Sequence, residues 1–346
     1  MRVETLELDS VSKEEIDQFL SELGNRLVYY SVEYNAFLSA ALPDTSSYCL
    51  LAFNETTLVG LLWFHVAEND EGTRVCNSLP FFGGHGGAIA ASSVSKMVNK
   101  LLLNEFVKFC EKEDVASTLI VENMFDRNMR NHDPALKLEV VDTRIGQMTS
   151  LPVGLAGGEL EDALFGMFHV KTRNAVRKGL KHIDSFSAVD TLDAWQWLER
   201  EHTEGILALN GLPKSAKVFA SLRASQLNIR LYVAGSEGRM DAGLVVILYG
   251  DTVEYFTPVS TPAARSSQVL SALIYLIMTE LTLSGYKVWN WGGTWQSQAG
   301  VYRFKSRFGA DDFQYCYYGR SLDDRLLMVE PAELQRQFPY YYVRRY

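Results

Sequence analysis

The chain has 346 residues, of which 47% are apolar and 22% are charged. This length and composition exclude a disordered protein and predict two packed domains rather than one core. The formal net charge of -9 argues against wide binding to DNA or other nucleic acids, which requires many cations on one face.

The N-terminal segment has acidic residues where a signal peptide would need a basic start and an apolar stretch, so we expect a cytoplasmic protein. The apolar segment 269–283 is too short to span a membrane and contains Ser271 and Glu280, so no integral membrane segment is expected.

The four cysteines are far apart, with no Cys-x-x-Cys pair and no histidine at zinc-ligand spacing. They predict reduced thiols and no metal site.

The first half begins with a predicted helix at 13–23, where Ser12 and Glu15 stand at capping-box spacing. Apolar runs then predict, in chain order, strands at 47–53, 58–66 and 74–78, a helix at 92–112 and a strand at 117–121.

The second half repeats this order. A helix at 192–210 precedes strands at 230–234, 242–248 and 252–257, which are followed by a helix at 266–283 and a strand at 287–290. The repeated order indicates a duplicated α/β (α+β) fold, with mixed sheets flanked by helices. We place the two domains at 1–160 and 161–346.

Two basic segments stand out in the second half. Residues 171–181 predict a short helix in which Arg173 and Arg177 share a face and Lys178 adds a third cation. Much later, Gly292 and Gly293 follow a predicted strand, and the segment 300–309 carries Arg303, Lys305 and Arg307 at the alternating spacing of a strand.

The order of these motifs resembles the Fem-type peptidoglycan aminoacyltransferases and their acyltransferase relatives. The motifs are Lys-Thr-Arg-Asn-x-x-Arg-Lys-x-x-Lys, then a strand, Gly-Gly, and Gly-x-x-Arg-Phe-Lys-x-x-Phe-Gly, over residues 165 to 310. The resemblance implies two tandem GNAT-type domains with an acyl-transfer site in the cleft between them. The chain departs from the family in two ways: Asn290 stands where many members have an acid, and the long helical hairpin of some cell-wall members has no counterpart.

Lys305 is the main catalytic candidate, because in the Fem-type relatives a lysine of this segment sits at the transfer site. An ammonium there can stabilise the oxyanion that forms when an amine attacks an acyl carbonyl, together with the backbone of Gly292 and Gly293. Glu254 and Tyr255, on one predicted strand, are candidates for proton transfer, although only one of two strand neighbours can face the site.

Binding of an anionic substrate is assigned to cations, because guanidinium groups can hold a diphosphate. The candidates are Arg173, Arg177, Lys178 and Arg303, with Arg265, Ser266 and Ser267 at the start of the long helix as a site for a donor pyrophosphate. For each basic segment, a solvated face is the alternative interpretation.

The function expected from the motifs is N-acyl transfer from an activated donor to an amine. Acyl-CoA is favoured as the co-substrate and no permanently bound cofactor is expected, while aminoacyl-tRNA is disfavoured by the acidic balance and the missing hairpin. The resemblance suggests an amino sugar of cell-wall or polysaccharide synthesis as the acceptor. The alternative is a non-catalytic binding module for a nucleotide-linked or phosphate-bearing ligand.

Overall fold

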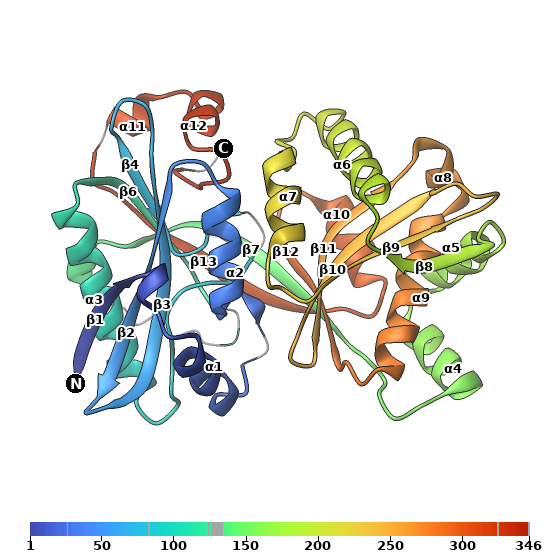
Figure 1. The fold of residues 1–346 in the computed structure, drawn as a ribbon, viewed down its shortest axis with the longest axis horizontal. Coiled ribbons are helices and arrows are strands. Elements are labelled where there is room, and N and C mark those ends of the chain that lie inside the picture. Colours follow the sequence, from blue (N-terminus) through green and yellow to red (C-terminus); the bar gives the residue numbers. More distant parts are fainter. Residues whose placement is uncertain (26, 82–83, 124, 126–133, 324, 345–346) are drawn as a thin grey trace. The chain divides into compact units, whose positions relative to one another are not determined.

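The computed structural model describes residues 1–346 apart from 26, 82–83, 124, 126–133, 324 and 345–346. The chain forms two compact units (Figure 1). Unit 1 consists of Met1–Gly146, Gly293–Gln296 and Phe313–Tyr346, and unit 2 consists of Gln147–Gly292 and Ser297–Asp312. Three strands have residues in both units: β7 (Glu139–Ser150), β12 (Val288–Trp295) and β13 (Asp311–Ser321).

These units differ from the expected single boundary between residues 160 and 161. Unit 1 ends its first segment at Gly146 and also includes the chain from Phe313 onward. The reason is a strand pairing, because β13 lies antiparallel to β6 (Val115–Val121), with Tyr317 opposite Val121. A pairing between segments so far apart leaves no trace in local sequence patterns.

The sheet of unit 1 has the strand order β1-β2-β3-β4-β6-β13. Its remaining strands are β1 (Arg2–Glu7), β2 (Thr45–Asn54), β3 (Thr57–Glu68) and β4 (Arg74–Asn77), and the short β5 (Ile89–Ala90) pairs with β3. Helix α1 (Lys13–Glu22) follows β1 through the 3-10 turn η1 (Leu8–Ser10), and α2 (Val32–Ala41) follows α1 through a second such turn, η2 (Val28–Tyr30). Helix α3 (Ser95–Lys112) lies between β5 and β6 in the chain.

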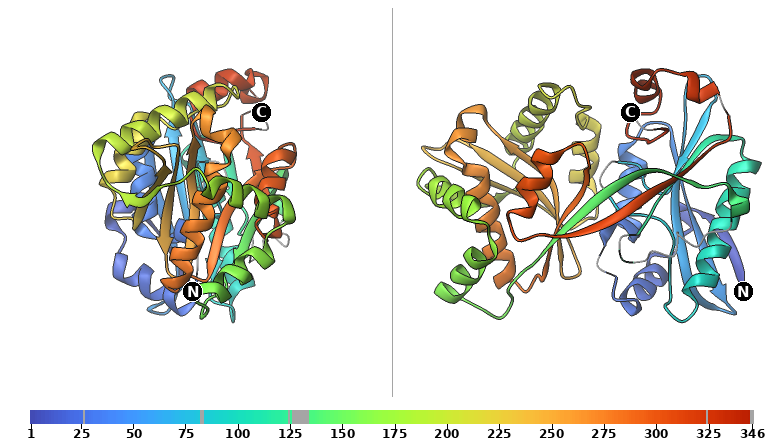
Figure 2. Two further views of the ribbon diagram at one scale, coloured as in Figure 1. Left: turned by 90° about the vertical axis from the view of Figure 1, so that its right-hand side faces the viewer. Right: turned by 180° about the vertical axis from the view of Figure 1, so that it is seen from behind.

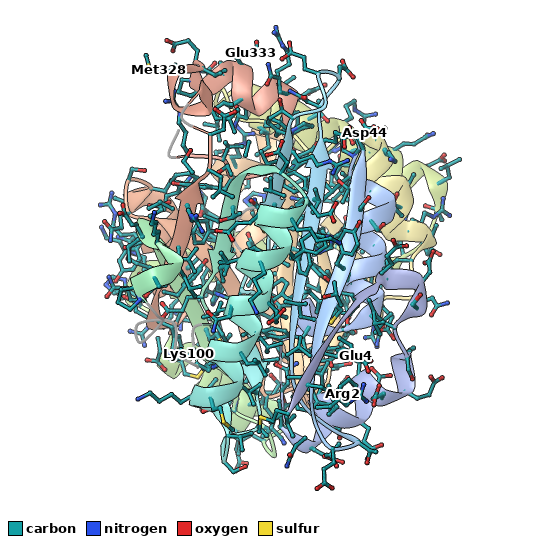
Figure 3. The ribbon with its side chains drawn as sticks, turned by 90° about the vertical axis from the view of Figure 1, so that its left-hand side faces the viewer. Arg2, Glu4, Asp44, Lys100, Met328 and Glu333 are labelled. Carbon is teal, nitrogen blue, oxygen red and sulfur yellow. The ribbon has the colours of Figure 1, made fainter. Side chains whose placement is uncertain are left out.

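Apolar periodicity explains how α3 packs on this sheet. Val98, Leu102 and Phe106 recur at helical spacing and are buried in one cluster with Leu50 and Phe64 of the sheet. Figure 3 views unit 1 from the side on which α3 covers the strands, with Lys100 on the exposed face of the helix. Unit 1 also contains η4 (Pro134–Leu136), between β6 and β7, and it ends with α11 (Arg325–Met328) and α12 (Pro331–Gln337).

The sheet of unit 2 has the strand order β7-β12-β11-β10-β9-β8. Its strands include β8 (Ser185–Val189), β9 (Ile229–Gly235), β10 (Ala242–Tyr249) and β11 (Thr252–Ser260), and its helices are α4 (Gly157–Met167), α5 (Val170–Leu180), α6 (Leu192–Leu207), α7 (Ala216–Ala224), α8 (Pro262–Ser267), α9 (Val269–Leu283) and α10 (Ala299–Ser306). Figure 2 shows further views of the ribbon. Helices α6 and α9 cover opposite faces, because Gly243 abuts Trp197 of α6 while its neighbour Leu244 is buried with the apolar residues of α9.

The predicted duplication is confirmed by the strand pairings. In unit 1, the consecutive strands from β1 to β4 pair antiparallel, the chain then forms α3, and β6 pairs in parallel with β4. In unit 2, the consecutive strands from β8 to β11 pair antiparallel, the chain then forms α9, and β12 pairs in parallel with β11. Each unit is therefore a mixed α/β sheet of the same topology, as expected.

Three local expectations were wrong. The segment with Arg303 and Lys305 is the helix α10, capped by Arg307, rather than a strand, and Gly292 and Gly293 lie within β12 rather than after it. The long helix expected at 266–283 is two helices, because Gln268 between them has a left-handed φ of 64°. Tertiary packing overrides alternating patterns in segments this short.

Candidate functional site in unit 2

The site lies around the point where β11 and β12 stop pairing. Their parallel ladder joins Thr252 with Val288 and ends with Glu254 opposite Asn290. There Asn290 Nδ2 donates to Glu254 Oε1 over 2.9 Å, and both side chains are buried. Asn290 Oδ1 in turn accepts from the backbone N of Gly292 at 2.9 Å, where the chain has a φ of 68°. Glycine tolerates this left-handed backbone.

Glu254 and Tyr255 face opposite sides of β11, as expected of strand neighbours. The ring of Tyr255 packs against Trp291 at 5.0 Å and Trp289 at 6.2 Å between centroids, and burial raises the pKa of its hydroxyl. β11 also carries a bulge, because Tyr255 pairs with Val246 and Thr257 with Val245, so Phe256 is the extra residue of the bulge.

Lys305 is nearly enclosed on α10, with 6% of its surface exposed. Desolvation lowers the pKa of its ammonium to about 8 from an ordinary 10.5. Since residues two apart on a helix point in different directions, Lys305 does not share the face of Arg303, which is exposed.

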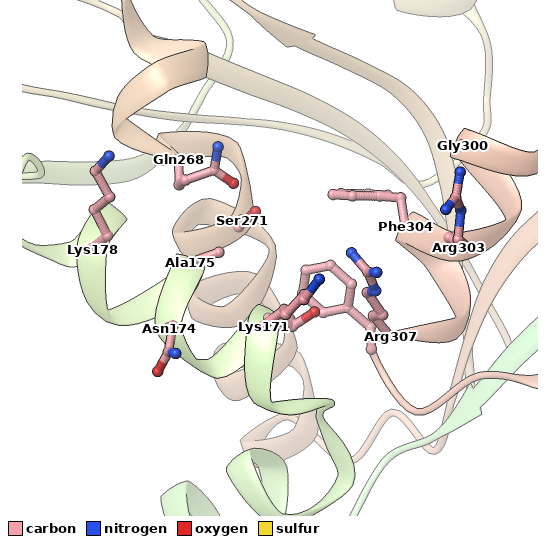
Figure 4. Close-up of a pocket in the computed structure, with 12 residues that line it drawn as sticks. Lys171, Asn174, Ala175, Lys178, Gln268, Ser271, Gly300, Arg303, Phe304 and Arg307 are labelled. Atoms are coloured by element: carbon pink, nitrogen blue, oxygen red, sulfur yellow. The ribbon is translucent and has the colours of Figure 1, made fainter.

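The residues that do share a space with Arg303 form a pocket of about 600 Å³ (Figure 4). It is built by one face of α5, by the junction of α8 and α9, and by α10 with the residues after it. The lining residues are Lys171, Thr172, Asn174, Ala175, Lys178, Gln268, Ser271, Gly300, Arg303, Phe304, Arg307 and Phe308.

Charge is the distinctive feature of this pocket. Lys171, Lys178, Arg303 and Arg307 line it, and none of the described lining residues is an Asp or Glu. The N-terminal end of α9, at Gln268 and Ser271, adds the positive end of a helix dipole. The pocket therefore suits a ligand with more than one negative charge, and its two phenylalanines offer an apolar surface beside it.

Two close approaches hold the walls of the pocket together. The backbone N of His169, which caps α5, donates to the carbonyl of Arg307 at 2.9 Å. At the other end of α5, Gly179 lies so close to α9 that an added Cβ would be 2.4 Å from the carbonyl oxygen of Gln268. A residue with a side chain would push α5 away from α9.

The predicted binding residues are distributed unevenly over this site. Lys178 and Arg303, from the two basic segments, line the same pocket. Arg177 instead lies over the ring of Phe165 at 4.9 Å, and Arg173 is not among the lining residues. The other predicted residues, Gly292, Gly293, Arg265, Ser266 and Ser267, lie outside the lining as well, the last three on α8.

Some lining residues of this pocket were not predicted from the sequence. Lys171, Asn174, Ala175 and Lys178 follow the i, i+3, i+4, i+7 spacing of one helix face, so the periodicity of the basic helix could have identified Lys171. Gln268 and Ser271 carry no such signal, because the break between α8 and α9 that places them at the pocket depends on tertiary contacts.

A second lysine of unit 2 was also missed. The ammonium of Lys214 lies 5.1 Å from the ring centroid of Phe256, the bulge residue of β11. The backbone N of Lys214 donates to Nε2 of His202 at 3.1 Å. Desolvation lowers the pKa of Lys214 to about 8 and that of His202 to about 3. This loop carries no sequence motif.

Among the described residues, no group of three or more His, Cys, Asp or Glu side chains could hold a metal ion. Within the same residues, no helix is both long and apolar enough to cross a membrane.

Comparison with known proteins identifies solved structures with a similar fold. No protein-family model matches the sequence, and a search of curated proteins gives no match. Solved structures do match over nearly the whole chain. FemX has a TM-score of 0.71 at 11% identity, with 94% of this chain and 99% of FemX covered.

Two further structures are similar. L-PGS from Bacillus licheniformis has a TM-score of 0.55 at 12% identity, covering 94% of this chain and 96% of that protein. A tandem GNAT protein from the clavulanic acid biosynthesis pathway has a TM-score of 0.56 at 11% identity, covering 92% and 98%. The predicted fold, two tandem GNAT-like domains as in the Fem type, is confirmed.

Proposed function

We propose that this protein is an N-acyltransferase that moves an acyl or aminoacyl group from a phosphate-bearing activated donor to an amine. The observation that carries the proposal is the pocket of unit 2, in which four cations from α5, α10 and the residue that caps α10 surround one space. No carboxylate is among the described lining residues. Such a pocket holds a polyanionic carrier, and the shared fold with FemX and a tandem GNAT protein supports a transfer reaction.

Acyl-CoA is the donor that we favour. Its phosphates would lie among Lys171, Lys178, Arg303 and Arg307, and the N-terminal end of α9 would add its dipole. Aminoacyl-tRNA is the second candidate donor, because the same four cations could hold its terminal phosphates; the net charge of -9 disfavours the rest of so large a polyanion. The acceptor amine is proposed from the resemblance to be an amino sugar.

Lys305 is proposed as the residue that stabilises the oxyanion of the transfer step. Attack of the amine on the acyl carbonyl places a negative charge on its oxygen, and a preorganised, desolvated ammonium stabilises that charge more strongly than a solvated one. Glu254, whose carboxylate is fixed by Asn290, is the candidate for accepting the proton of the attacking amine.

The test begins with ligand binding. Acetyl-CoA, coenzyme A and an aminoacylated RNA minihelix are compared by thermal shift, because a ligand that binds the native state raises the melting temperature by mass action. Any ligand that binds is then assayed for transfer to glucosamine and to other amines. Binding with transfer supports the proposal; binding without transfer to any amine supports the non-catalytic binding module instead.

Lys305→Met then tests the catalytic assignment. Loss of one preorganised donor typically lowers turnover by on the order of a hundredfold or more. We expect that loss with an unchanged melting temperature and unchanged donor binding. An active Lys305→Met enzyme would move the role to another residue, with Glu254 and Tyr255 the next candidates.

A further inference from the structure

A hydrogen-bonded chain of three buried side chains lies in unit 1, far in sequence from the site above. Ser47 Oγ is 2.8 Å from Nδ1 of His65, its cross-strand partner on β3, and Nε2 of His65 is 3.0 Å from Oδ1 of Asn35 on α2. His65 and Asn35 are fully buried, and 6% of Ser47 is exposed.

The contacts of Asn35 fix the direction of every hydrogen in this chain. Its Nδ2 donates to the carbonyls of Tyr29 and Ser31, at 3.1 and 2.8 Å, so Oδ1 must face His65. His65 therefore carries its hydrogen on Nε2, and its Nδ1 lone pair accepts from the hydroxyl of Ser47. A serine that donates to an imidazole held by a third group is the arrangement of an activated nucleophile.

Ser47 also lines a pocket. The pairing of β1 with β2 ends at Glu7 opposite Tyr48, and the chain then forms η1. The first residues of β2, from Thr45 to Ser47, are therefore not paired with β1. The resulting pocket has about 190 Å³ and is lined by Glu7, Leu8, Asp9, Ser39, Ser46, Ser47 and Tyr48. Two carboxylates and no basic side chain line it among the described residues, so it favours a ligand with a positive charge.

The equivalent place in unit 2 shows which part of this arrangement comes with the fold. There the pairing of β8 with β9 ends at Val189 opposite Leu231. A pocket of about 350 Å³ lies beside this end, as the smaller pocket of unit 1 lies beside the end of the β1–β2 pairing. The residue at the position of Ser47 is Arg230, and it pairs with Val246 rather than a histidine. The pocket thus belongs to the duplicated fold, whereas the serine, histidine and asparagine belong to unit 1 alone.

We propose that Ser47 is a nucleophile that takes an acyl group from a small, cationic, activated ester or thioester bound in this pocket. The Oγ–acyl bond forms as the bond to the leaving oxygen or sulfur breaks. The Ser47 proton passes to Nδ1 of His65 and from there to the leaving group. Water then attacks the acyl-serine by the same route in reverse, releases the acid and restores the serine.

The environment of His65 limits which acyl groups react. Burial lowers the pKa of His65 to about 3, so the ring is neutral at physiological pH and its Nδ1 lone pair is available. The same burial makes the imidazole a weak base. The acyl group must therefore carry a good leaving group, as in a thioester or an activated ester, and amides should not react.

The test uses the full chain and does not depend on the proposed transfer reaction of unit 2. The protein is treated with a fluorophosphonate probe, and the modified residue is located by mass spectrometry. We expect an adduct on Ser47, none in Ser47→Ala, and an unchanged adduct in Ser46→Ala, which alters a neighbouring serine of the same pocket without a histidine contact. We also expect labelling at least about a hundredfold slower in His65→Gln. No adduct on Ser47 in the folded protein overturns the proposal, and so does equal labelling of a folded His65→Gln variant.

Charge selectivity gives a second readout, which depends on changing the exposed Glu7 and Asp9. Hydrolysis of acetylthiocholine is compared with that of its uncharged analogue, S-(3,3-dimethylbutyl) thioacetate. We expect the cationic thioester to react several-fold faster. This preference should be lost in the double variant Glu7→Gln/Asp9→Asn. Ser47→Ala should show no hydrolysis above background. Equal rates for the two thioesters, or hydrolysis that survives in Ser47→Ala, would contradict the assigned pocket and nucleophile.

Discussion

Asn290 and Glu254 meet on the last rung of the parallel ladder between β12 and β11, where the amide of Asn290 donates to the buried carboxylate at 2.9 Å. The Fem-type resemblance places an acid at this position. In this chain the amide is a hydrogen-bond donor, which a carboxylate at neutral pH could not be. The Asn290 side chain therefore gives Glu254 a hydrogen bond that a carboxylate at position 290 could not give.

Asn290→Asp should consequently make stability depend on pH. Two adjacent buried carboxyls raise the pKa of the pair, because like charges disfavour ionisation. A group with a raised folded pKa contributes its stability below the unfolded pKa and loses it as pH rises through the folded pKa. We expect the variant to match the wild type near pH 4 and to lose about 3 kcal/mol by pH 7, measured by chemical denaturation.

Asn290→Ala is the matched control, because it removes the same hydrogen bond without adding a charge. Its deficit in the free energy of unfolding should be nearly constant over the same pH range. If the free energy of unfolding of both variants depended on pH in the same way, Glu254 and the new carboxyl group at position 290 would not repel each other as charged groups.

Turnover should fall as pH rises through about 8 if Lys305 acts as a cation. Desolvation sets the pKa of Lys305 near 8, and the neutral amine formed above it cannot stabilise an oxyanion as an ammonium does. The measurement is kcat between pH 6.5 and 9.5 with saturating substrates. Lys305→Arg keeps its charge over this range, so any activity that it retains should lack the decline near pH 8. A rate that rises through pH 8 would instead identify Lys305 as a base.

Arg303→Ala and Lys178→Ala should each weaken binding of the phosphate-bearing donor by roughly tenfold, because each removes one contact to an anion in the pocket. Arg173→Ala is the control from the same helix as Lys178, since Arg173 does not line the pocket. Arg177→Ala should likewise bind normally, because its guanidinium lies over Phe165. The dissociation constants would be measured by calorimetry at two salt concentrations. Losses of equal size in all four variants would argue for a diffuse basic surface.

Gly179→Ala should destabilise unit 2 by roughly 1–3 kcal/mol and weaken donor binding, because the added Cβ meets the backbone of Gln268 and the side chain of Ala272 at 2.7 Å. Gly166→Ala in α4 is the matched control, since nothing lies within 4 Å of its added Cβ. That variant should be more stable by about 0.5–1 kcal/mol. Thermal and chemical unfolding would measure both, and a tolerated alanine at 179 would contradict the tight contact of α5 with α9.

Local patterns were sufficient for most elements of the two units. Helical spacing of Val98, Leu102 and Phe106 predicted α3, and Ser12 caps α1 through the backbone N of Glu15 as its spacing indicated. The repeated order of strands and helices predicted the duplication. Each of these signals is carried by residues close together in the chain, where periodicity reports burial directly.

The site followed from sequence only in part. The two basic segments were found, and Lys178 and Arg303 do line one pocket. The strand expected around Lys305 is a helix, however, and this change of period turns Lys305 away from Arg303 and into the interior. Three cations at every second position are compatible with a strand and with a short helix, so the sequence alone does not distinguish the two.

What the sequence determined by itself is the set of elements, their duplication, and the presence of cations in two segments. Tertiary structure alone decided which cations share a pocket, how far burial lowers the pKa of Lys305, and that residues from Phe313 onward return to unit 1. The reason is physical. Element formation depends on neighbours a few residues away, whereas shared cavities, desolvation and strand pairing depend on groups that only the folded chain brings together.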